Sequence, residues 1–413
     1  MAAREFDIAL FGATGFVGKL TAHYLVEAAP AGARIALAGR SLEKLAAVRA
    51  ELGPLAAEWP LVQADSTDQE SLNALAARTK VVVTTVGPYL RYGFPLVQAC
   101  AENGTHYADL TGEALFIRDC IDRFGDKAAE TGAKIVNSCG FDSIPSDLSV
   151  YQLYKRSVAD NTGELTDVTL VAFLKGGMSG GTIDSIRALV EAVAEEPAKA
   201  SVMAHPYSLS PDKSMDPDVG RQSDQALSRA SDIDPSLDGW VATFIMGAHN
   251  TKIVRRSNGL LGWPYGKNFR YKEVMSAGSS AASPLVAAGI AGGIVATMAT
   301  GAVLSRVPLG RKLIDRIVPA PGTGPDEKAR RNGWFTMRTF AHTTSGAKYK
   351  CTFAGKGDPG YQATAVMLGQ AGLCLAFDDL PELAGILTPA SAMGDALTER
   401  LRAADITIEV TPA

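Results

Sequence analysis

The sequence predicts an α/β protein that begins with a doubly wound parallel sheet and is long enough for a second domain. Short apolar runs alternate with segments of helical period over the first 145 residues, which is typical of a parallel sheet with helices on both faces. Three glycines spaced three residues apart follow the first apolar run. The 413 residues are 46% hydrophobic and 20% charged, an ordinary globular composition, and this length favours two domains.

A glycine-rich turn joins the first predicted strand, 7–11, to the first predicted helix, 14–28. Glycine lets the backbone turn tightly, lets a phosphate come close and lets the helix pack on the strand, while N–H groups at the helix start face the anion. A glycine pattern alone also fits a plain corner between strand and helix, so the following strands must decide. We predict a Rossmann dinucleotide site with contacts from Gly12, Thr14, Gly15, Phe16, Val17 and Gly18.

The end of the second predicted strand, 34–38, indicates which dinucleotide binds. An acidic residue there would accept a hydrogen bond from a ribose 2′-hydroxyl, whereas an arginine accommodates a 2′-phosphate, and this chain has Arg40. We therefore predict NADP(H), with Ser41 and Lys44 as further phosphate contacts. A surface arginine at a helix start is the alternative. The third predicted strand ends in Asp65, placed to meet the adenine amino group.

The fourth predicted strand ends in a turn expected to pass under the nicotinamide. Helical segments at 42–52 and 71–78 separate the earlier strands and complete the alternating pattern. The predicted cofactor contacts in this turn are Val86, Gly87, Pro88 and Tyr89.

Several segments together resemble the saccharopine dehydrogenase-like reductases: FGATGFVG, AGRS, VGPY, GTHYADLTGE and CGFDSIPSDLS. Within that family the chain is most similar to the actinobacterial trans-acting enoyl reductases, which serve polyketide-derived lipid synthesis. The resemblance is densest over residues 5–180. It implies an NADP-binding Rossmann domain at 1–145, an inserted α+β substrate and dimerisation domain at 146–355, and a C-terminal segment at 356–413 that packs back on the first domain.

The resemblance also implies reduction of a carbon–carbon double bond beside a thioester. That reaction needs a hydride for the β-carbon, a group that polarises the carbonyl and a proton for the α-carbon. Tyr89 is the first candidate for the proton, although a tyrosine that only packs over the nicotinamide is the alternative; Tyr107 and Asp142 are the others. Cys139 is interpreted as structural rather than nucleophilic, and with Gly140 it is placed among the cofactor contacts.

An enzyme that binds several carboxylates is expected to line a small pocket with arginines, whereas the inserted domain has FLKGGMSGGTIDSIRALVEAV and then a long apolar stretch. The substrate is therefore expected to be a lipid or polyketide acyl group, free or bound to a carrier. A saccharopine-type amino-acid dehydrogenase is therefore a weaker alternative. The other alternative is a catalytically silent nucleotide-binding scaffold attached to membrane or lipid droplets.

An uncharged run, Val274–Ser305, lies within a basic region: residues 251–331 hold 13 Lys and Arg but 4 Asp and Glu. Apolar segments flanked by cations and aromatic side chains are typical of contact with anionic membrane surfaces. We predict such a contact through 252–316, peripheral or monotopic, on the cytoplasmic side of the plasma membrane or on lipid droplets. A homodimer interface through Gly289 and Gly293, or a plain core helix, are the alternatives. The predicted membrane-facing side chains are Lys252, Arg255, Arg256, Trp263, Tyr265, Lys267, Phe269, Arg270, Tyr271, Lys272, Arg306, Arg311, Lys312 and Arg316.

Other residue types suggest no further chemistry. The five cysteines are scattered and the N-terminus lacks a signal-peptide pattern, so we expect a reduced, cytosol-facing protein. The five histidines lie far apart in the sequence without metal-ligand spacing. No nucleic-acid motif is recognisable, and we expect neither a metal nor a nucleic-acid partner.

Overall fold

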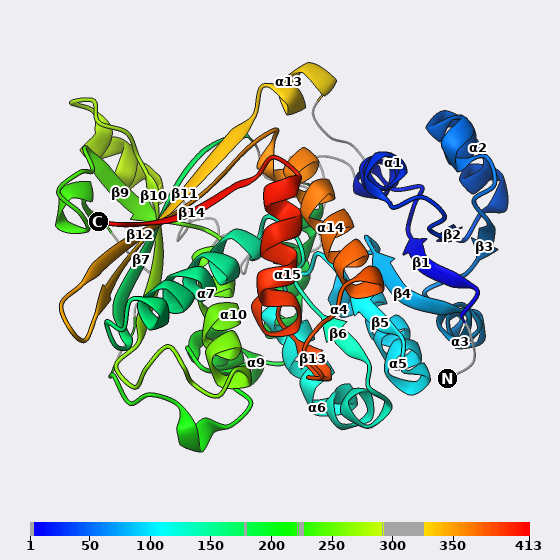
Figure 1. Cartoon of the computed structure of the whole chain (residues 1–413), viewed down its shortest axis with the longest axis horizontal. Coiled ribbons are helices and arrows are strands. Elements are labelled where there is room, and N and C mark those ends of the chain that lie inside the picture. Colours follow the sequence, from blue (N-terminus) through cyan, green and yellow to red (C-terminus); the bar gives the residue numbers. More distant parts are fainter. Residues whose placement is uncertain (1–3, 177–179, 221, 223–226, 291, 293–325) are drawn as a thin grey trace.

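The computed structural model places two seven-stranded sheets side by side, with helices around and between them (Figure 1). The first sheet, from the N-terminal part of the chain, lies on the right of Figure 1 and the second on the left. The structure describes the chain except for residues 1–3, 177–179, 221, 223–226, 291 and 293–325.

The first sheet is parallel at every strand pairing, as the alternating pattern predicts. Its order is β13-β6-β5-β4-β1-β2-β3, so the strand order reverses between β1 and β4. Ligands of such sheets bind at the carboxyl ends of the strands at this reversal. The strands are β1 (Phe6–Phe11), β2 (Ile35–Gly39), β3 (Leu61–Gln63), β4 (Thr79–Thr84), β5 (His106–Ala108), β6 (Lys134–Val136) and β13 (Gly385–Leu387).

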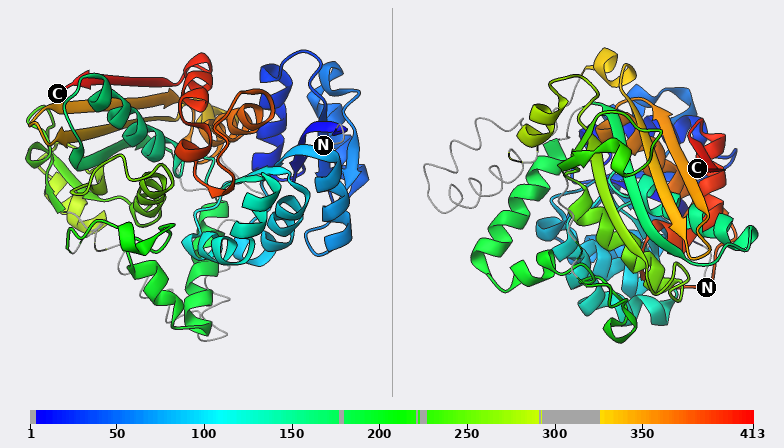
Figure 2. Two further views of the ribbon diagram at one scale, coloured as in Figure 1. Left: turned by 60° about the horizontal axis from the view of Figure 1, so that its bottom comes forward. Right: turned by 90° about the vertical axis from the view of Figure 1, so that its left-hand side faces the viewer.

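Helices cover both faces of the first sheet (Figures 1 and 2). Alternate residues of β1 enter different apolar cores, Ile8 and Leu10 on one face and Ala9 and Phe11 on the other. This double burial explains why β1 is apolar except at Asp7, which forms an ion pair with Arg34 at 2.8 Å. The helices are α1 (Phe16–Ala28), α2 (Leu42–Leu52), α3 (Gln69–Arg78), α4 (Tyr89–Tyr92), α5 (Phe94–Asn103), α6 (Ala114–Thr131), α14 (Thr364–Phe377) and α15 (Pro389–Ala403).

The second sheet is mixed and has the order β14-β12-β11-β7-β10-β9-β8. Two helices, α7 (Ile144–Ala159) and α10 (Gly247–Leu260), contact the strands at its centre. Its strands β11 and β12 form an antiparallel pair. The strands are β7 (Leu165–Lys175), β8 (Leu227–Arg229), β9 (Trp240–Thr243), β10 (Arg270–Ser276), β11 (Trp334–Thr343), β12 (Lys348–Lys356) and β14 (Thr407–Pro412).

The C-terminal segment divides between the two sheets. Helix α14 packs on α1 and β4, and β13 extends the first sheet beside β6, as a return to the first domain requires. The last strand, β14, instead pairs with β12 of the second sheet. The expected assignment of all of 356–413 to the first domain is therefore wrong for its final strand. The physical reason is that pairing of β14 with the edge of β12 buries the side chain of Ile408 in the large apolar core.

Several side chains predicted to face a membrane are buried in the protein. Lys252, Arg255 and Arg256 lie on α10 and are only 2–3% exposed. The guanidinium of Arg256 donates to the carbonyl oxygens of Leu209 and Ile386, and burial lowers the pKa of Arg256 to about 9. Three of the expected interfacial aromatic residues are also buried. The prediction that these side chains contact lipid is wrong for Lys252, Arg255, Arg256, Tyr265, Phe269 and Tyr271.

The apolar run is described only in its first half. Residues 283–290 are helical, and Leu285 and Val286 are 79% and 46% exposed. Among the described residues, no helix has both the length and the apolar character that crossing a bilayer requires. The rest of the run, Gly293 and the cations Arg306, Arg311, Lys312 and Arg316 lie outside the described residues.

Candidate cofactor and active site

The glycine turn after β1 packs so closely against its surroundings that larger residues would not fit there. Gly12 has φ +88°, and a Cβ atom there would lie 2.7 Å from Cγ2 of Val86. A Cβ atom on Gly18 would lie 2.1 Å from the carbonyl oxygen of Gly12. Glycine is therefore required for the turn itself and for the packing of α1 against it, two of the reasons expected of a dinucleotide-binding turn.

The start of α1 is open to an anion. Gly15 is exposed at the N-cap, and in the described part of the chain no side chain caps the helix by a hydrogen bond. Thr14, Phe16 and Val17 are half-buried around it. Uncapped N–H groups and the positive end of the helix dipole are the features that bind a pyrophosphate. The residues present thus fit NADP(H) at this turn.

The ends of β2 and β3 form a basic corner suited to a ribose 2′-phosphate. Arg40 and Lys44 are exposed, while the Ser41 hydroxyl accepts the N–H of Lys44 at 3.3 Å and caps α2. Asp65 accepts two hydrogen bonds from Thr67, both of 2.9 Å, which lower the pKa of the carboxyl group. One carboxylate oxygen of Asp65 therefore stabilises the turn that contains Thr67. The basic side chains that can bind the phosphate are those of Arg40 and Lys44.

Tyr89 holds together the turn after β4. Its hydroxyl donates to the Thr84 carbonyl at 3.3 Å and accepts the Leu110 N–H at 3.1 Å. The residue is 4% exposed, and burial raises the pKa of the phenol well above its usual value. Because the hydroxyl is occupied on both sides, this geometry favours a positioning role, and proton donation by Tyr89 stays a prediction without structural support.

Tyr107 supports Asp109 beneath the site. The fully buried Tyr107 hydroxyl donates to Oδ2 of Asp109 at 2.9 Å. The same carboxyl group accepts hydrogen bonds from Thr111, Asn137 and Ser138 at 2.8–3.0 Å, and burial raises its pKa to about 6. Tyr107 therefore orients the loops after β5 and β6. Because its hydroxyl is already bonded to Asp109, proton donation by Tyr107 stays a prediction.

Of the three candidates for the proton donor, Asp142 is the one whose functional group is not bonded to other described residues. It lies between β6 and α7, is half-buried, and forms no hydrogen bond or ion pair with the described residues. Hydrogen bonds fix the residues on either side of Asp142. The Phe141 N–H donates to the Thr364 hydroxyl at 3.1 Å, and the Ser143 hydroxyl donates to Asn250 at 2.9 Å. Burial raises the pKa of Asp142 to about 6. The carboxyl group can thus exchange a proton near neutral pH.

Cys139 and Gly140 form the turn that leads to Asp142. The Cys139 N–H donates to the Asp109 carbonyl at 2.7 Å, and burial raises the pKa of its thiol. A Cβ atom on Gly140 would lie 2.8 Å from Leu110. A protonated, fully buried thiol agrees with the interpretation of Cys139 as structural. The absence of a side chain at Gly140 lets the loops after β5 and β6 pack against each other.

A contact that sequence reasoning missed joins these loops to the second domain. Glu113 accepts the N–H groups of Tyr89 and Leu90 at 2.9 and 2.7 Å, and the Ser185 hydroxyl at 2.6 Å. Ser185 lies on α8 (Gly180–Glu195). Glu113 thus binds the first N–H groups of α4 and also joins α8 to the turn after β4.

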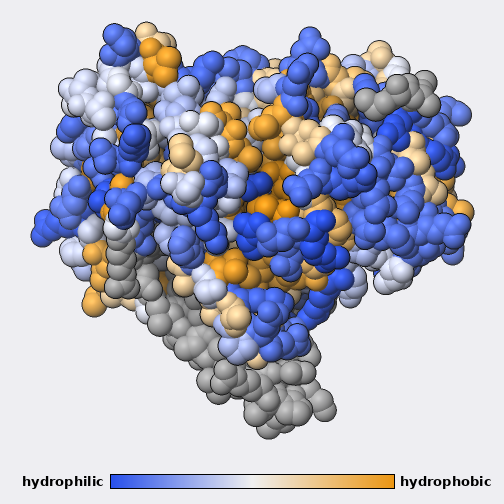
Figure 3. Space-filling view, turned by 90° about the horizontal axis from the view of Figure 1, so that it is seen from below, coloured by the Kyte–Doolittle hydropathy of each residue, from blue (hydrophilic) through white to orange (hydrophobic). Residues whose placement is uncertain are grey.

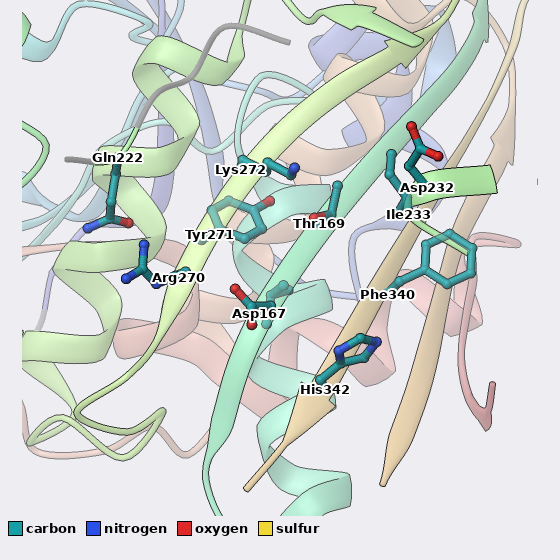
Figure 4. Close-up of a pocket in the computed structure, with 11 residues that line it drawn as sticks. Asp167, Thr169, Gln222, Asp232, Ile233, Arg270, Tyr271, Lys272, Phe340 and His342 are labelled. Atoms are coloured by element: carbon teal, nitrogen blue, oxygen red, sulfur yellow. The ribbon is translucent and has the colours of Figure 1, made fainter. Parts of the chain in front are cut away.

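A separate pocket of about 370 Å³ lies on the second sheet, away from these residues (Figure 4). Arg270 and Lys272 of β10, Asp167 of β7 and His342 of β11 line it, and these side chains form no ion pair with one another. None of the predicted cofactor residues contributes to it.

Apolar surface gathers elsewhere, between the two halves of the molecule as seen from below (Figure 3). Within the described residues, no cluster of three His, Cys, Asp or Glu side chains could hold a metal ion.

Comparison with known proteins agrees with this geometry. The family model described as the saccharopine dehydrogenase NADP binding domain matches residues 8–137. A Mycobacterium tuberculosis protein is 52% identical over 99% of this chain and 98% of its own length. Proteins named trans-acting enoyl reductase from Mycobacterium bovis and Mycobacterium ulcerans are 50% and 48% identical, with 99% of each chain covered. The solved saccharopine dehydrogenase (L-Glu forming) of Saccharomyces cerevisiae covers 98% of this chain and 99% of its own, with a TM-score of 0.55 at 12% identity.

Fold and site together define an NADP-dependent oxidoreductase. The chain belongs to the saccharopine dehydrogenase-like family and, within it, to the group of mycobacterial trans-acting enoyl reductases that it resembles over its full length.

Replacing Arg40 by alanine should weaken binding of NADPH while leaving that of NADH nearly unchanged. Loss of a charge-assisted contact to the 2′-phosphate should cost roughly 1.5–3 kcal/mol, or about ten- to hundredfold in Kd. Fluorescence titration of both reduced cofactors measures this. Equal affinity of the wild type for the two cofactors would contradict the assignment of Arg40.

Proposed function

We propose that this protein is an enoyl reductase that reduces the α,β double bond of a lipid or polyketide acyl intermediate. Support comes from its full-length similarity to proteins named trans-acting enoyl reductase. The structural observation that supports the proposal is Asp142, a carboxyl group that forms no hydrogen bond with the described residues and lies after β6, on the β4 side of the strand reversal.

The residues around Asp142 supply the other requirements of such a reaction. NADPH supplies the hydride for the β-carbon when it is bound. Asp142 then gives its proton to the α-carbon and regains one from solvent. Tyr89, Tyr107 and Asp109 hold the loops that follow β5 and β6, because their polar groups are bonded to the backbone of those loops or to one another.

The substrate that we propose is an acyl thioester, free or bound to a carrier. The apolar surface between the two halves of the molecule favours a hydrophobic acyl chain over an amino acid (Figure 3). Leu110, beside Gly140, and Met246, beside Gly112, are partly exposed apolar side chains at the loops that follow β5 and β6. A hydrophobic chain could lie there with its double bond near Asp142.

The wild type should oxidise NADPH in the presence of enoyl thioesters, and Asp142→Asn should lower kcat about a hundredfold or more. In the wild type, kcat should fall as pH rises through about 6, because Asp142 loses its proton there. The variant should lack this pH dependence. Absorbance at 340 nm over a range of acyl lengths and pH values measures both effects.

Asp126→Asn is the matched control, because Asp126 is exposed on α6. Its kcat and the NADPH affinity of both variants should stay within about twofold of the wild type. If no thioester in the panel causes oxidation, the scaffold alternative replaces enoyl reduction. If Asp142→Asn retains the wild-type kcat, another group donates the proton.

We also propose a narrowed form of the membrane contact, with the protein held peripherally on the cytoplasmic face of the plasma membrane or on lipid droplets. Its described part consists of the exposed cations Lys267, Arg270 and Lys272 and the exposed apolar pair Leu285 and Val286. Cations near an anionic surface contribute about 1 kcal/mol each, and exposed apolar side chains can enter the headgroup region.

Replacing Lys267, Arg270 and Lys272 together by glutamine should weaken binding to anionic liposomes roughly a hundredfold at low salt. The wild type should sediment with such liposomes, and less so as salt screens the charges. Liposomes of neutral phosphatidylcholine and the NADPH affinity of the variant serve as controls. A wild type that stays in the supernatant at low salt would rule out the membrane contact.

A further inference from the structure

Two adjacent residues of the second domain bind the loop that carries Asp142, one on each side of it. His249 and Asn250 lie near the start of α10, which packs beside α7 (Figure 1). Nε2 of His249 lies 3.0 Å from the hydroxyl oxygen of Ser138, which precedes Asp142. Oδ1 of Asn250 accepts the hydroxyl of Ser143, which follows Asp142, at 2.9 Å. All four of these bonded side chains are buried, so a single turn of α10 holds the loop at both ends.

Ser138 has a backbone conformation that is unfavourable for a residue with a side chain. Its φ is +63°, in the left-handed region. Its N–H donates to Asp109 at 2.8 Å, and its hydroxyl donates to the Thr111 carbonyl at 2.6 Å. Because the hydroxyl has a single proton, it can only accept from His249, and Nε2 of His249 therefore carries a proton. Three hydrogen bonds, the third of them from α10, thus hold Ser138 in this conformation.

The His249 ring is neutral near neutral pH. Burial lowers the pKa of His249 to about 3, because the charged ring would lose its hydration. A neutral ring that already donates its Nε2 proton to Ser138 is not a source of protons for a substrate. What the ring supplies is the hydrogen bond that holds Ser138.

Ser143 is also bonded to α10 in place of its usual local partner. It is the N-cap residue of α7, where a serine hydroxyl normally accepts a backbone N–H of the first turn, and it makes no such bond. The amide of Asn250 is oriented by its other partners. Its N–H groups donate to Oε2 of Glu273 at 2.9 Å and to the Ser146 hydroxyl at 3.2 Å, so its oxygen faces Ser143. Since Glu273 is fully buried on β10, this end of the loop is anchored in the second sheet.

We propose that His249 and Asn250 are positioning residues that place the Asp142 carboxyl group at the α-carbon of the substrate by holding both ends of its loop. The inference rests on the proposed enoyl reduction with Asp142 as the proton donor. Proton transfer requires hydrogen-bond distance and a fixed orientation, so a displacement of about 1 Å would slow the reaction while leaving NADPH binding intact. The second domain would then fix the geometry of proton transfer on a loop that belongs to the first.

The test releases one end of the loop at a time. Ser143→Ala removes the bond to Asn250 and leaves that to His249, whereas His249→Phe does the reverse. In each variant, amide hydrogen exchange at 138–143 should become about tenfold faster, while exchange at 12–18 and the affinity for NADPH stay within about twofold of the wild type. With an enoyl thioester that the wild type reduces, kcat should fall about tenfold or more at an unchanged KM.

Ser157→Ala is the matched control, because Ser157 is a buried serine of α7 whose hydroxyl bonds within its own helix, to the Tyr154 carbonyl at 2.9 Å. Its kcat and its exchange at 138–143 should stay within about twofold of the wild type. His249→Gln should recover part of the kcat lost in His249→Phe, because the glutamine amide can replace the Nε2 donor. Should His249→Phe fail to fold, Ser138→Gly removes the same bond from the loop side and tolerates the positive φ.

The proposal is overturned if exchange at 138–143 is unchanged in Ser143→Ala and His249→Phe, or if exchange becomes faster and kcat does not fall. It is also overturned if His249→Gln is as slow as His249→Phe, or if the variants raise KM at constant kcat. A wild type that oxidises NADPH with no thioester overturns the inference together with the proposed function. Unchanged exchange in the variants of an active enzyme overturns the inference alone.

Discussion

The site depends on one steric constraint, the close approach of α1 to the turn that follows β1. The space for a Cβ atom on Gly18 is filled by the Gly12 carbonyl oxygen, 2.1 Å away, and that on Gly12 is filled by Val86 of the neighbouring strand end. This contact brings the start of α1, the turn after β4 and the reversal of strand order into one place. Every proposed cofactor contact is arranged around that place, from Arg40 on one side to Gly140 on the other.

Buried hydrogen bonds connect the candidate cofactor site to the second domain. Helix α10 has a polar sequence and yet is buried, and unpaired polar groups in such a position cost free energy. Its partners explain the burial. Arg256 binds the Ile386 carbonyl in β13 of the first sheet, and Asn250 accepts the hydroxyl of Ser143 beside Asp142. The helix therefore both joins the two sheets and supports the loop that carries the candidate proton donor.

Local patterns in the sequence predict the first domain well. The glycine turn, the alternation of apolar runs and helical segments, and the residues at strand ends all depend on neighbours within a few positions. The predicted helix 42–52 coincides with α2, and the strand expected at 7–11 begins one residue earlier, at Phe6. The saccharopine dehydrogenase-like resemblance rests on these same segments, and the comparisons confirm it.

Long-range partners explain where the sequence interpretation was wrong or incomplete. Lys252, Arg255 and Arg256 look like a basic surface in the sequence, because nothing local shows that the carbonyls of Leu209 and Ile386 will meet Arg256. The sequence also contains no signal that β14 would leave the first domain or that Ser185 would reach Glu113 across 72 residues. Tyr89 had the expected location, but only the structure shows that its hydroxyl is already bonded to Thr84 and Leu110.

The central claim is that the cofactor lies across the carboxyl ends of the first sheet, from the corner of Arg40 to the loop of Asp142. Hydrogen–deuterium exchange with and without NADPH tests it most directly. We expect slower exchange of the amides at 12–18, 40–44, 85–90 and 138–143, with the edge strands β8 and β9 unchanged. Protection confined to the second sheet, or its absence at 12–18 under saturating NADPH, would contradict the account.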